Sequence, residues 1–501
     1  MLGLVAPGAL LTRDVTKVPL VARSGEVTRV GIPWCQAGEP GRGPRAEGEN
    51  MSAQSLGEQT VDLLGRLVRL GCVNDLTADS GGEERAADLL EDFFAGLPVS
   101  IERITPHPGR TSLVVTVEGA DPLSVGTPLT LLGHTDVVPV DEAKWTRDPF
   151  GAHIEDDVMW GRGTVDMLQL TAAMAVVTRE VARRAQDGNP PARSLVFVAA
   201  ADEEARGGLG VPWIGEHRPD ALPWDAALSE MGGAHIRGRR GGDSVVVVVG
   251  EKGAAQRRLH IRGDAGHGSV PLGRTSAVER LSQVSAALSA ARWPTATDEV
   301  WAGFVRAFEF DETTETSLIH GTYEGDYSEF EDLAAFAHAF SHVTVAQTVA
   351  HSGGPINVMP SHATLELDIR TLPGVDDDDV DAAIAVALGD LAEHVTIERL
   401  LCEDATASSI DTDLYRAIEA ALTKRYPGAS VVPVLFPGGT DLRVARRRGG
   451  IGYGFGAVDS GASLGQVYSQ LHAHDEHIAL ADVRATAEVL HEVATSYLTH
   501  V

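Results

Sequence analysis

The chain has 501 residues, of which 43% are hydrophobic and 22% are charged, so it is long enough for two or three domains with sizeable cores. Its 71 acidic residues outnumber its 41 lysines and arginines, which gives a formal net charge of −30. A surface this acidic repels nucleic-acid phosphates and anionic membranes, so we expect neither nucleic acid nor membrane as a partner.

The three cysteines, Cys35, Cys72 and Cys402, lie far apart and form neither a disulfide framework nor a Cys-x-x-Cys metal pair. This pattern favours a reducing compartment, and we expect a cytoplasmic protein. No apolar run approaches the roughly 18 residues that a membrane span needs. The first residues, MLGLVAPGALLTRD, lack a basic segment before the apolar ones, so we expect no signal peptide.

Residues 1–50 differ in composition from the rest of the chain. The stretch 38–50 is dense in glycine, proline and charge and offers nothing to bury, so residues 1–50 are expected to form a flexible extension. Met51 follows immediately. The segment is therefore either an ordinary flexible extension or a stretch upstream of a translation start at Met51.

From residue 51 to 249, helical and strand patterns alternate. Apolar residues recur every three or four positions between Met167 and Val181, which predicts a long amphipathic helix. Further helices are expected over 61–68 and 84–97, and strands over 112–119, 129–134, 194–200 and 225–230. Such alternation predicts an α/β sheet with helices on both faces.

Near residue 250 the pattern changes, and it changes back after residue 400. Strands are expected over 245–253, 256–263, 363–373 and 394–400, with helices over 276–293 and 375–391. This β-α-β-β-α-β order predicts a small inserted domain over 250–400, after which the α/β pattern resumes over 401–501. The aspartates at 376–379 fit a helix N-terminus, where negative charge is stabilised.

Acidic residues and histidines gather where the expected strands end. His134 and Asp136 are two apart and share a face, so the aspartate can orient a metal-binding imidazole. Asp166 precedes the long helix, where capping would be its ordinary role. The adjacent Glu203 and Glu204 follow a buried strand, and two neighbouring carboxylates are unfavourable without a cation or a proton.

Two more clusters complete the set. Glu230 ends another short strand, and residues 471–478 (LHAHDEHI) contain three histidines. The strand ends therefore bring acids and histidines to one edge of the sheet, where open α/β folds build their sites. The set has carboxylates and imidazoles but no thiolate, which suits zinc, manganese or cobalt.

The ordered series GHTDVVPV, W-x-x-DPF, GRGTVDM, DEE, LSE and a C-terminal His-x-x-x-Glu resembles a known family over roughly residues 55–500. It is the zinc exopeptidase family of aminoacylase, acetylornithine deacetylase, succinyl-diaminopimelate desuccinylase and glutamate carboxypeptidase. The resemblance implies a mixed-sheet α/β catalytic domain made of residues 51–249 and 401–501. It also implies that 250–400 is an inserted α+β lid and dimerisation domain, attached only at about residues 250 and 400.

The resemblance implies two divalent metal ions, with zinc expected and cobalt or manganese as alternatives. The implied ligands of the first ion are His134, Asp166 and Glu230, while Asp166 bridges to the second ion, which Glu204 and His472 complete. Asp136 would orient His134, and Glu203 would act as general base. His472 is preferred to His474 and His477 because of its spacing from Glu476, and truncating Glu476 or His477 is expected to reduce metal content far less than Asp166→Ala does.

The resemblance also implies residues that contact substrate. His267, in RGDAGHGSVP, is expected to lie far from its own metal cluster and to reach the active site of a partner subunit in a homodimer. Asn357 and Arg370 would line the substrate region. Gly439 and Thr440, in GGTD, would bind the substrate carboxylate through backbone N–H groups and a hydroxyl. Many relatives have lysine where this chain has Leu168, a difference that bears on substrate preference.

The implied activity is hydrolysis of amide bonds in N-acyl amino acids or short peptides, with removal of an acyl group from a diamino acid, by a desuccinylase or deacetylase, as the alternative. Two other classes stay open. GASLG (461–465) matches the G-x-S-x-G motif of serine hydrolases through Ser463, although that motif requires a preceding strand and a later acid and histidine. A non-catalytic binding protein on the same fold is the other, but no expected ligand is missing.

Overall fold

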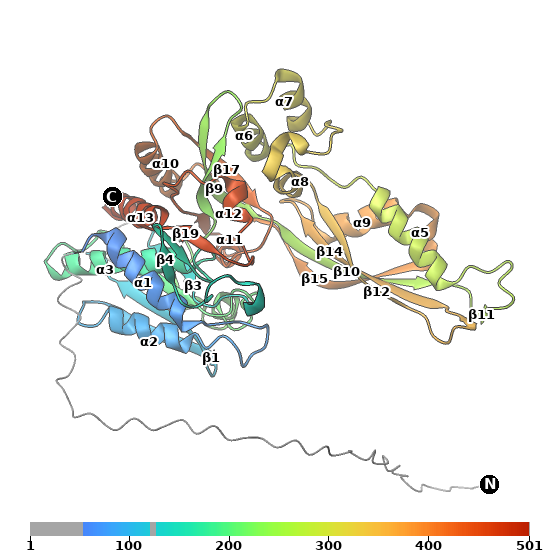
Figure 1. Cartoon of the computed structure of the whole chain (residues 1–501), viewed down its shortest axis with the longest axis horizontal. Helices are drawn as coiled ribbons and strands as arrows, with labels where there is room; N and C mark the ends of the chain where they lie inside the picture. Colours follow the sequence, from blue (N-terminus) through green and yellow to red (C-terminus); the bar gives the residue numbers. More distant parts are fainter. Residues whose placement is uncertain (1–53, 121–126, 500–501) are drawn as a thin grey trace, which may run out of the picture. The chain divides into compact units, whose positions relative to one another are not determined.

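A computed structural model describes residues 54–120 and 127–499 (Figure 1). The expected extension at 1–50 and the alternative start at Met51 lie outside these residues. Residues 53–501 form one compact unit. In the part of the chain that the structure describes, no helix combines the length and the apolar character that a membrane span requires.

The large sheet has ten strands in the order β1-β2-β6-β3-β7-β18-β9-β16, with β8 and β17 also paired to β9. The central strands β6, β3 and β7 are mutually parallel, whereas β2 runs antiparallel to β6 and β18 antiparallel to β9, so the sheet is mixed. The strand bounds are β1 Ser100–His107, β2 Arg110–Val117, β3 Leu129–His134, β6 Leu195–Ala200, β7 Ala226–Ser229, β8 Gly232–Arg237, β9 Asp243–Glu251, β16 Thr406–Ala407, β17 Ser430–Phe436 and β18 Ile451–Gly454.

Helices cover both faces of this sheet. Every residue of β6 (LVFVAA) is buried, as expected for a strand with helices on both sides. On one face Val198 packs against Val211 and Ile214 of α4; on the other the Phe197 ring lies 6.0 Å from that of Phe94, just after α2. The helices are α1 Leu56–Leu70, α2 Glu84–Phe93, α3 Leu168–Gln186, α4 Val211–His217, α10 Asp413–Arg425, α11 Leu442–Arg447 and α13 Leu480–Thr499.

The four-stranded sheet has the order β12-β14-β10-β15 and carries α5 and α9. The strands of this sheet and its two helices follow the order β10-α5-β12-β14-α9-β15, which matches the expected β-α-β-β-α-β pattern and the α/β fold with an inserted α+β segment. The strand expected over 245–253 was assigned to the wrong sheet, because it is β9 of the large sheet, and β12 was not predicted. Asp376 caps α9 by accepting hydrogen bonds from the N–H groups of Asp378 and Asp379. The bounds are β10 Gly253–Arg262, α5 Ala277–Ala290, β12 Thr344–Ser352, β14 His362–Thr371, α9 Asp377–Leu388 and β15 Val395–Glu403.

Between α5 and β12 lie three helices that the sequence did not predict: α6 (Glu299–Ala307), α7 (Glu312–Ile319) and α8 (Ala334–Ser341). Trp301 and Phe304 of α6 are buried in one apolar cluster with Val432 and Val434 of β17. The inserted segment thus also packs against the large sheet through α6 and β17, in addition to its two chain connections at about residues 250 and 400. The domain boundaries themselves stay a prediction.

Two small strand groups bear on the site. β19 (His477–Ala479) pairs with β5 (Val158–Trp160), which pairs with β4 (His153–Glu155). The pairing of β19 with β5 brings the C-terminal histidine segment against the turn that precedes α3. β11 (Gly266–His267) pairs with β13 (Val358–Met359), and this hairpin-like pair lies at the far end of the four-stranded sheet in Figure 1.

Candidate metal centre

The three parallel strands in the middle of the large sheet each end next to a residue with a metal-binding side chain. His134 is the last residue of β3, Glu203 and Glu204 follow β6, and Glu230 directly follows β7. Because β6, β3 and β7 are adjacent and parallel, these four side chains meet at one edge of the sheet.

Asp166 and His472 reach the same place through the pairing of β5 with β19. The two oxygens of Asp166 face different imidazoles: Oδ1 lies 3.3 Å from His134 Nε2, and Oδ2 lies 3.4 Å from His472 Nε2. Glu230 Oε2 lies 3.8 Å from His134 Nε2, and Glu204 Oε2 lies 3.2 Å from His472 Nε2. The five side chains therefore form two adjacent groups that share Asp166.

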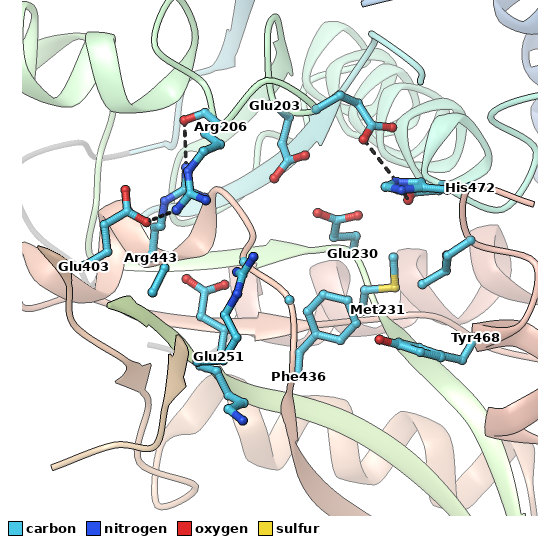
Figure 2. A pocket seen from close by; sticks show the side chains of 18 of the residues that line it. Glu203, Arg206, Glu230, Met231, Glu251, Glu403, Phe436, Arg443, Tyr468 and His472 are labelled. Atoms are coloured by element: carbon cyan, nitrogen blue, oxygen red, sulfur yellow. Dashed lines mark hydrogen bonds and ion pairs between the residues drawn. The ribbon is translucent and has the colours of Figure 1, made fainter. Parts of the chain in front are cut away.

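Glu203 lies beside the two groups that share Asp166. One of its carboxylate oxygens is within 4.8 Å of donor atoms of His134 and Glu230. In Figure 2 its side chain points into the pocket, toward Glu230 and on the same side as His472. We call this cavity of about 420 Å³ the metal-centre pocket. Its lining includes the carboxylates just described together with His472, and also Lys252, Arg370 and Phe436.

Burial and mutual repulsion determine the protonation of these acids. Burial raises the pKa of Glu230 to about 8 and that of Glu204 to about 7, and burial followed by the charge of Glu230 raises the pKa of Glu203 well above its usual range. Hydrogen bonds to Asp166 and Glu204 raise the pKa of His472 to about 10. Burial alone would raise the pKa of Asp166, but its two imidazole neighbours hold it below the usual value.

These features fit divalent cations. Carboxylates and imidazoles are the donors that zinc, manganese and cobalt accept, and a cation would replace the protons that burial otherwise favours on the acids. Glu204 Oε1 is buried and has no hydrogen-bond partner among the described residues, so it has a lone pair free for a cation. Among the described residues, two overlapping sets have donor atoms within 4.8 Å of one another: His134, Glu203 and Glu230, and His134, Asp166 and Glu204.

Asp136 contacts both the His134 ring and the turn that carries Glu203 and Glu204. Its backbone carbonyl oxygen lies 2.9 Å from His134 Nδ1, whereas its carboxylate lies 3.5 Å away, so the carbonyl is the nearer acceptor for the ring. The carboxylate instead accepts the backbone N–H groups of Glu203 at 3.2 Å and Glu204 at 3.1 Å. The carboxylate therefore faces the ring and also holds the turn that carries the two glutamates, and its expected role in orienting His134 stays a prediction.

Sequence reasoning missed a buried polar network behind Asp136. Asn74 donates one amide N–H to Asp136 at 2.8 Å and another to Asp202 at 3.2 Å, and it accepts from Arg110 at 3.0 Å. The Arg110 side chain is fully buried and pairs with Glu83 at 2.5 Å. Asn74 and Glu83 lie in loop or turn segments without periodicity, and only the burial of a charged residue within an apolar strand could have marked Arg110.

Glu476 holds the turn that carries Asp166. Its fully buried carboxylate accepts from the Arg162 guanidinium at 2.7 Å and from the backbone N–H groups of Gly163, Val165 and Asp166 at 3.0, 2.6 and 3.1 Å. Glu476 therefore fixes the backbone of the residue shared by both groups, so we expect it to contribute to metal binding, while its expected smaller effect than that of Asp166→Ala stays a prediction.

We accordingly expect Glu476→Gln, which keeps the side-chain shape but removes the charge, to weaken metal binding about 10- to 100-fold, as changes behind a metal ligand do. Metal titration of the folded, metal-stripped variant measures this. His477→Ala is the control, because the His477 ring stacks on Trp160 at 4.2 Å and faces no metal group. An unchanged metal affinity in folded Glu476→Gln would show that the turn holds without this carboxylate.

The predicted substrate residues divide into those that line the pocket and those that do not. Arg370 and Gly439 line it. Thr440 is buried, and both its N–H and its hydroxyl donate to Glu251, at 2.6 and 2.7 Å. The expectation that the Thr440 hydroxyl binds substrate is therefore corrected, because Glu251 already uses that donor to hold the glycine-rich loop.

His267 and Asn357 lie together, away from the pocket. The exposed His267 belongs to β11, and the N–H of the next residue, Gly268, donates to the Asn357 carbonyl oxygen at 2.7 Å. β10 has ten residues and starts beside the pocket at Ala254, so at about 3.3 Å per residue its far end lies on the order of 30 Å away. Within one chain, neither residue lines the metal-centre pocket.

Ser463 does not have the surroundings of a nucleophile. It follows a loop rather than a strand and caps the five-residue helix α12 (Leu464–Tyr468) by accepting from the Gln466 N–H. Its hydroxyl donates to Asp332 at 3.1 Å. This geometry contradicts the serine-hydrolase alternative.

The fold and the paired carboxylate–imidazole groups define a metallopeptidase-like architecture, and comparisons with known proteins agree. Residues 130–496 match the model of the peptidase family M20/M25/M40, and the chain belongs to this family. It is 27% identical over 331 residues to a probable carboxypeptidase S-like 2 of Dictyostelium discoideum, a match that spans 63% of this chain and 62% of that relative. The expected family resemblance is confirmed.

Solved structures show the same fold. A metallo-carboxypeptidase of the M20 family from Sulfolobus solfataricus aligns over 88% of this chain and 99% of its own, with a TM-score of 0.63 and 19% identity. A dinuclear metal-binding peptidase of the M20 family from Bacillus subtilis covers 88% of this chain and 98% of its own, with a TM-score of 0.55 and 14% identity.

Proposed function

We propose that this chain hydrolyses amide bonds in N-acyl amino acids or short peptides with a free carboxyl terminus, using two divalent metal ions, with zinc as the expected metal. The observation that carries the proposal is the position of Asp166, which directs one oxygen toward each of two imidazole–carboxylate groups while Glu203 lies beside them. Membership in a peptidase family supports the reaction class.

Two bound metal ions would polarise the scissile carbonyl and lower the pKa of the attacking water. Glu203 then takes a proton from that water and passes it to the leaving amine. The neighbouring Glu204 points to His472 and serves the metal, so the two adjacent glutamates have different tasks. The Asp136 carboxylate accepts the backbone N–H groups of both glutamates and so fixes the turn from which their side chains project.

The pocket lining supports a substrate with one anionic and one apolar part. Arg370, on β14, offers a guanidinium for a free carboxylate, although it is held in place by Asp368 at 2.9 Å. Phe436, Tyr468 and Leu471 line the same pocket and offer apolar contact to a side chain or acyl group. N-acyl amino acids combine both features.

Metal removal tests this function. We expect a chelator to abolish hydrolysis of N-acyl amino acids and dipeptides, and added zinc, manganese or cobalt to restore it, because the proposed reaction needs the metal ions to activate the attacking water. The measurement is the rate with a panel of N-acyl amino acids and dipeptides before stripping, after stripping and after reloading. Activity that survives complete removal of metal would refute the proposal.

We further propose that the active protein is a homodimer in which His267 of the partner subunit completes the pocket. Two observations support this: His267 is exposed in β11, which follows the far end of β10 away from its own metal-centre pocket, and β12 is an edge strand whose second half is exposed. An exposed edge strand is a natural surface for pairing with a second chain.

A further inference from the structure

A second cavity, of about 230 Å³, lies behind one wall of the metal-centre pocket. Most of its lining is apolar and includes Val165, Leu170, Val458, Val467 and Ile478. None of the proposed metal ligands lines it, and neither does the proposed general base. The mechanism above therefore leaves this cavity without a role.

The two cavities are adjacent. Met231 lines both of them. The remainder of the wall is the short segment from α12 to His472, in which Val467 and Gln470 line the second cavity while Tyr468 and Leu471 line the metal-centre pocket. Residues three apart lie on the same face of a helical turn, so two neighbouring faces of this segment border the two cavities.

Met231 has the properties of a movable closure. It directly follows Glu230 and adopts a φ of +71°, in the left-handed region that non-glycine residues rarely occupy. In Figure 2 its side chain lies between Glu230 and Tyr468. An unbranched thioether has several accessible rotamers, so the side chain can swing aside without a change in the backbone.

Gln169 places at the second cavity a buried amide oxygen that has no hydrogen-bond partner in the described part of the chain. Its side chain is buried, with the residue 8% exposed, and lines the cavity. The side-chain carbonyl oxygen has no hydrogen-bond partner among the described residues. Buried acceptors are nearly always satisfied, so this amide is available to a group that enters the cavity.

We propose that the second cavity binds the end of an unbranched, mainly apolar chain of the substrate, which enters from the metal-centre pocket past Met231. The Gln169 amide then faces a water or a polar group at the end of that chain. This inference rests on the proposed function and narrows its substrates to amides that carry a long chain. The chain can belong to the acyl group or to the amino-acid side chain, and the chemistry of the cavity is the same for both.

The test uses the zinc-loaded protein and two substrate series: N-acyl alanines from acetyl to decanoyl, and N-acetyl amino acids with unbranched side chains of increasing length. In the series whose growing chain enters the second cavity, kcat/KM is expected to rise about threefold per added methylene, because each buried methylene contributes favourably to binding. Val467→Phe, which fills the cavity, should abolish the rise and leave the acetyl-alanine rate intact. Ser469→Phe, which places the same ring at an exposed position nearby, should keep the rise.

A second measurement does not depend on turnover. Calorimetry measures the binding of unbranched fatty acids from hexanoate to dodecanoate. The wild type should bind them more tightly as they lengthen, and Val467→Phe should raise the dissociation constant of the longest at least tenfold. Equal dissociation constants in both proteins, with flat kcat/KM in both series, would overturn the inference while acetyl-alanine hydrolysis still upheld the proposed function. Chain-dependent binding without any hydrolysis would instead uphold the cavity and refute the function.

Discussion

Glu203→Gln is expected to lower kcat by about 10²- to 10⁴-fold, the usual contribution of a general acid–base group, while both metal ions stay bound. The glutamine keeps the size of the side chain and the backbone N–H that donates to Asp136, so the turn that carries Glu204 is preserved. Steady-state kinetics on the best substrate, together with metal analysis of the same sample, measures both quantities.

The matched control for this variant is Glu403→Gln. Glu403 also lines the metal-centre pocket, but it pairs with Arg206 at 2.5 Å instead of facing the metal groups. We expect its kcat to stay within about threefold of the wild type, since an exposed ion pair contributes little. Near-normal activity of Glu203→Gln with a full complement of metal would exclude Glu203 as the base.

The second large effect is expected from mixing two inactive variants. His267→Ala should retain metal and lose activity, whereas Asp166→Ala should lose the metals because both groups share that residue. In a mixed dimer one active site has intact ligands and an intact His267 of the partner subunit. Random exchange in equal amounts should therefore restore about a quarter of wild-type activity, since half the dimers are mixed and each has one working site.

Differently tagged subunits make this experiment decisive. Sequential purification on both tags isolates the mixed dimers, and their activity is compared with each variant alone. If mixed dimers form and remain inactive, His267 does not act across an interface. If the protein stays monomeric and His267→Ala is fully active, the proposed homodimer itself is wrong.

The part of the fold and site that the sequence predicts is the part with periodic or local signals. The buried strand before Glu203 and the strand that ends at His134 are continuous apolar runs, so the convergence of their terminal side chains follows from parallel pairing. The choice of His472 rested only on its spacing from Glu476. The structure brings His472 to within 3.2 Å of Glu204, while its role as a ligand stays a prediction.

Other features depend on long-range contacts that a single sequence does not reveal. Helix α6 does carry a helical signal, with Trp301, Phe304, Val305 and Phe308 at three- and four-residue spacing, but its packing on β17 joins segments more than a hundred residues apart. The role of Glu476 depends on the backbone N–H groups that its carboxylate accepts from, and that of Thr440 on the Glu251 carboxylate to which it donates. Those partners are distant in the sequence, and neither residue type at those positions reveals them.

The shared amide of Asn74 has a consequence for natural variation and for engineering of this chain. One side chain satisfies Asp136, Asp202 and Arg110 at once, so the effect of changing any of them depends on whether the others are intact. Coupled polar groups of this kind give non-additive effects. Asn74 and its partners should therefore behave as an epistatic unit, in which a substitution harmful alone is tolerated only when a second one removes the group left without a partner.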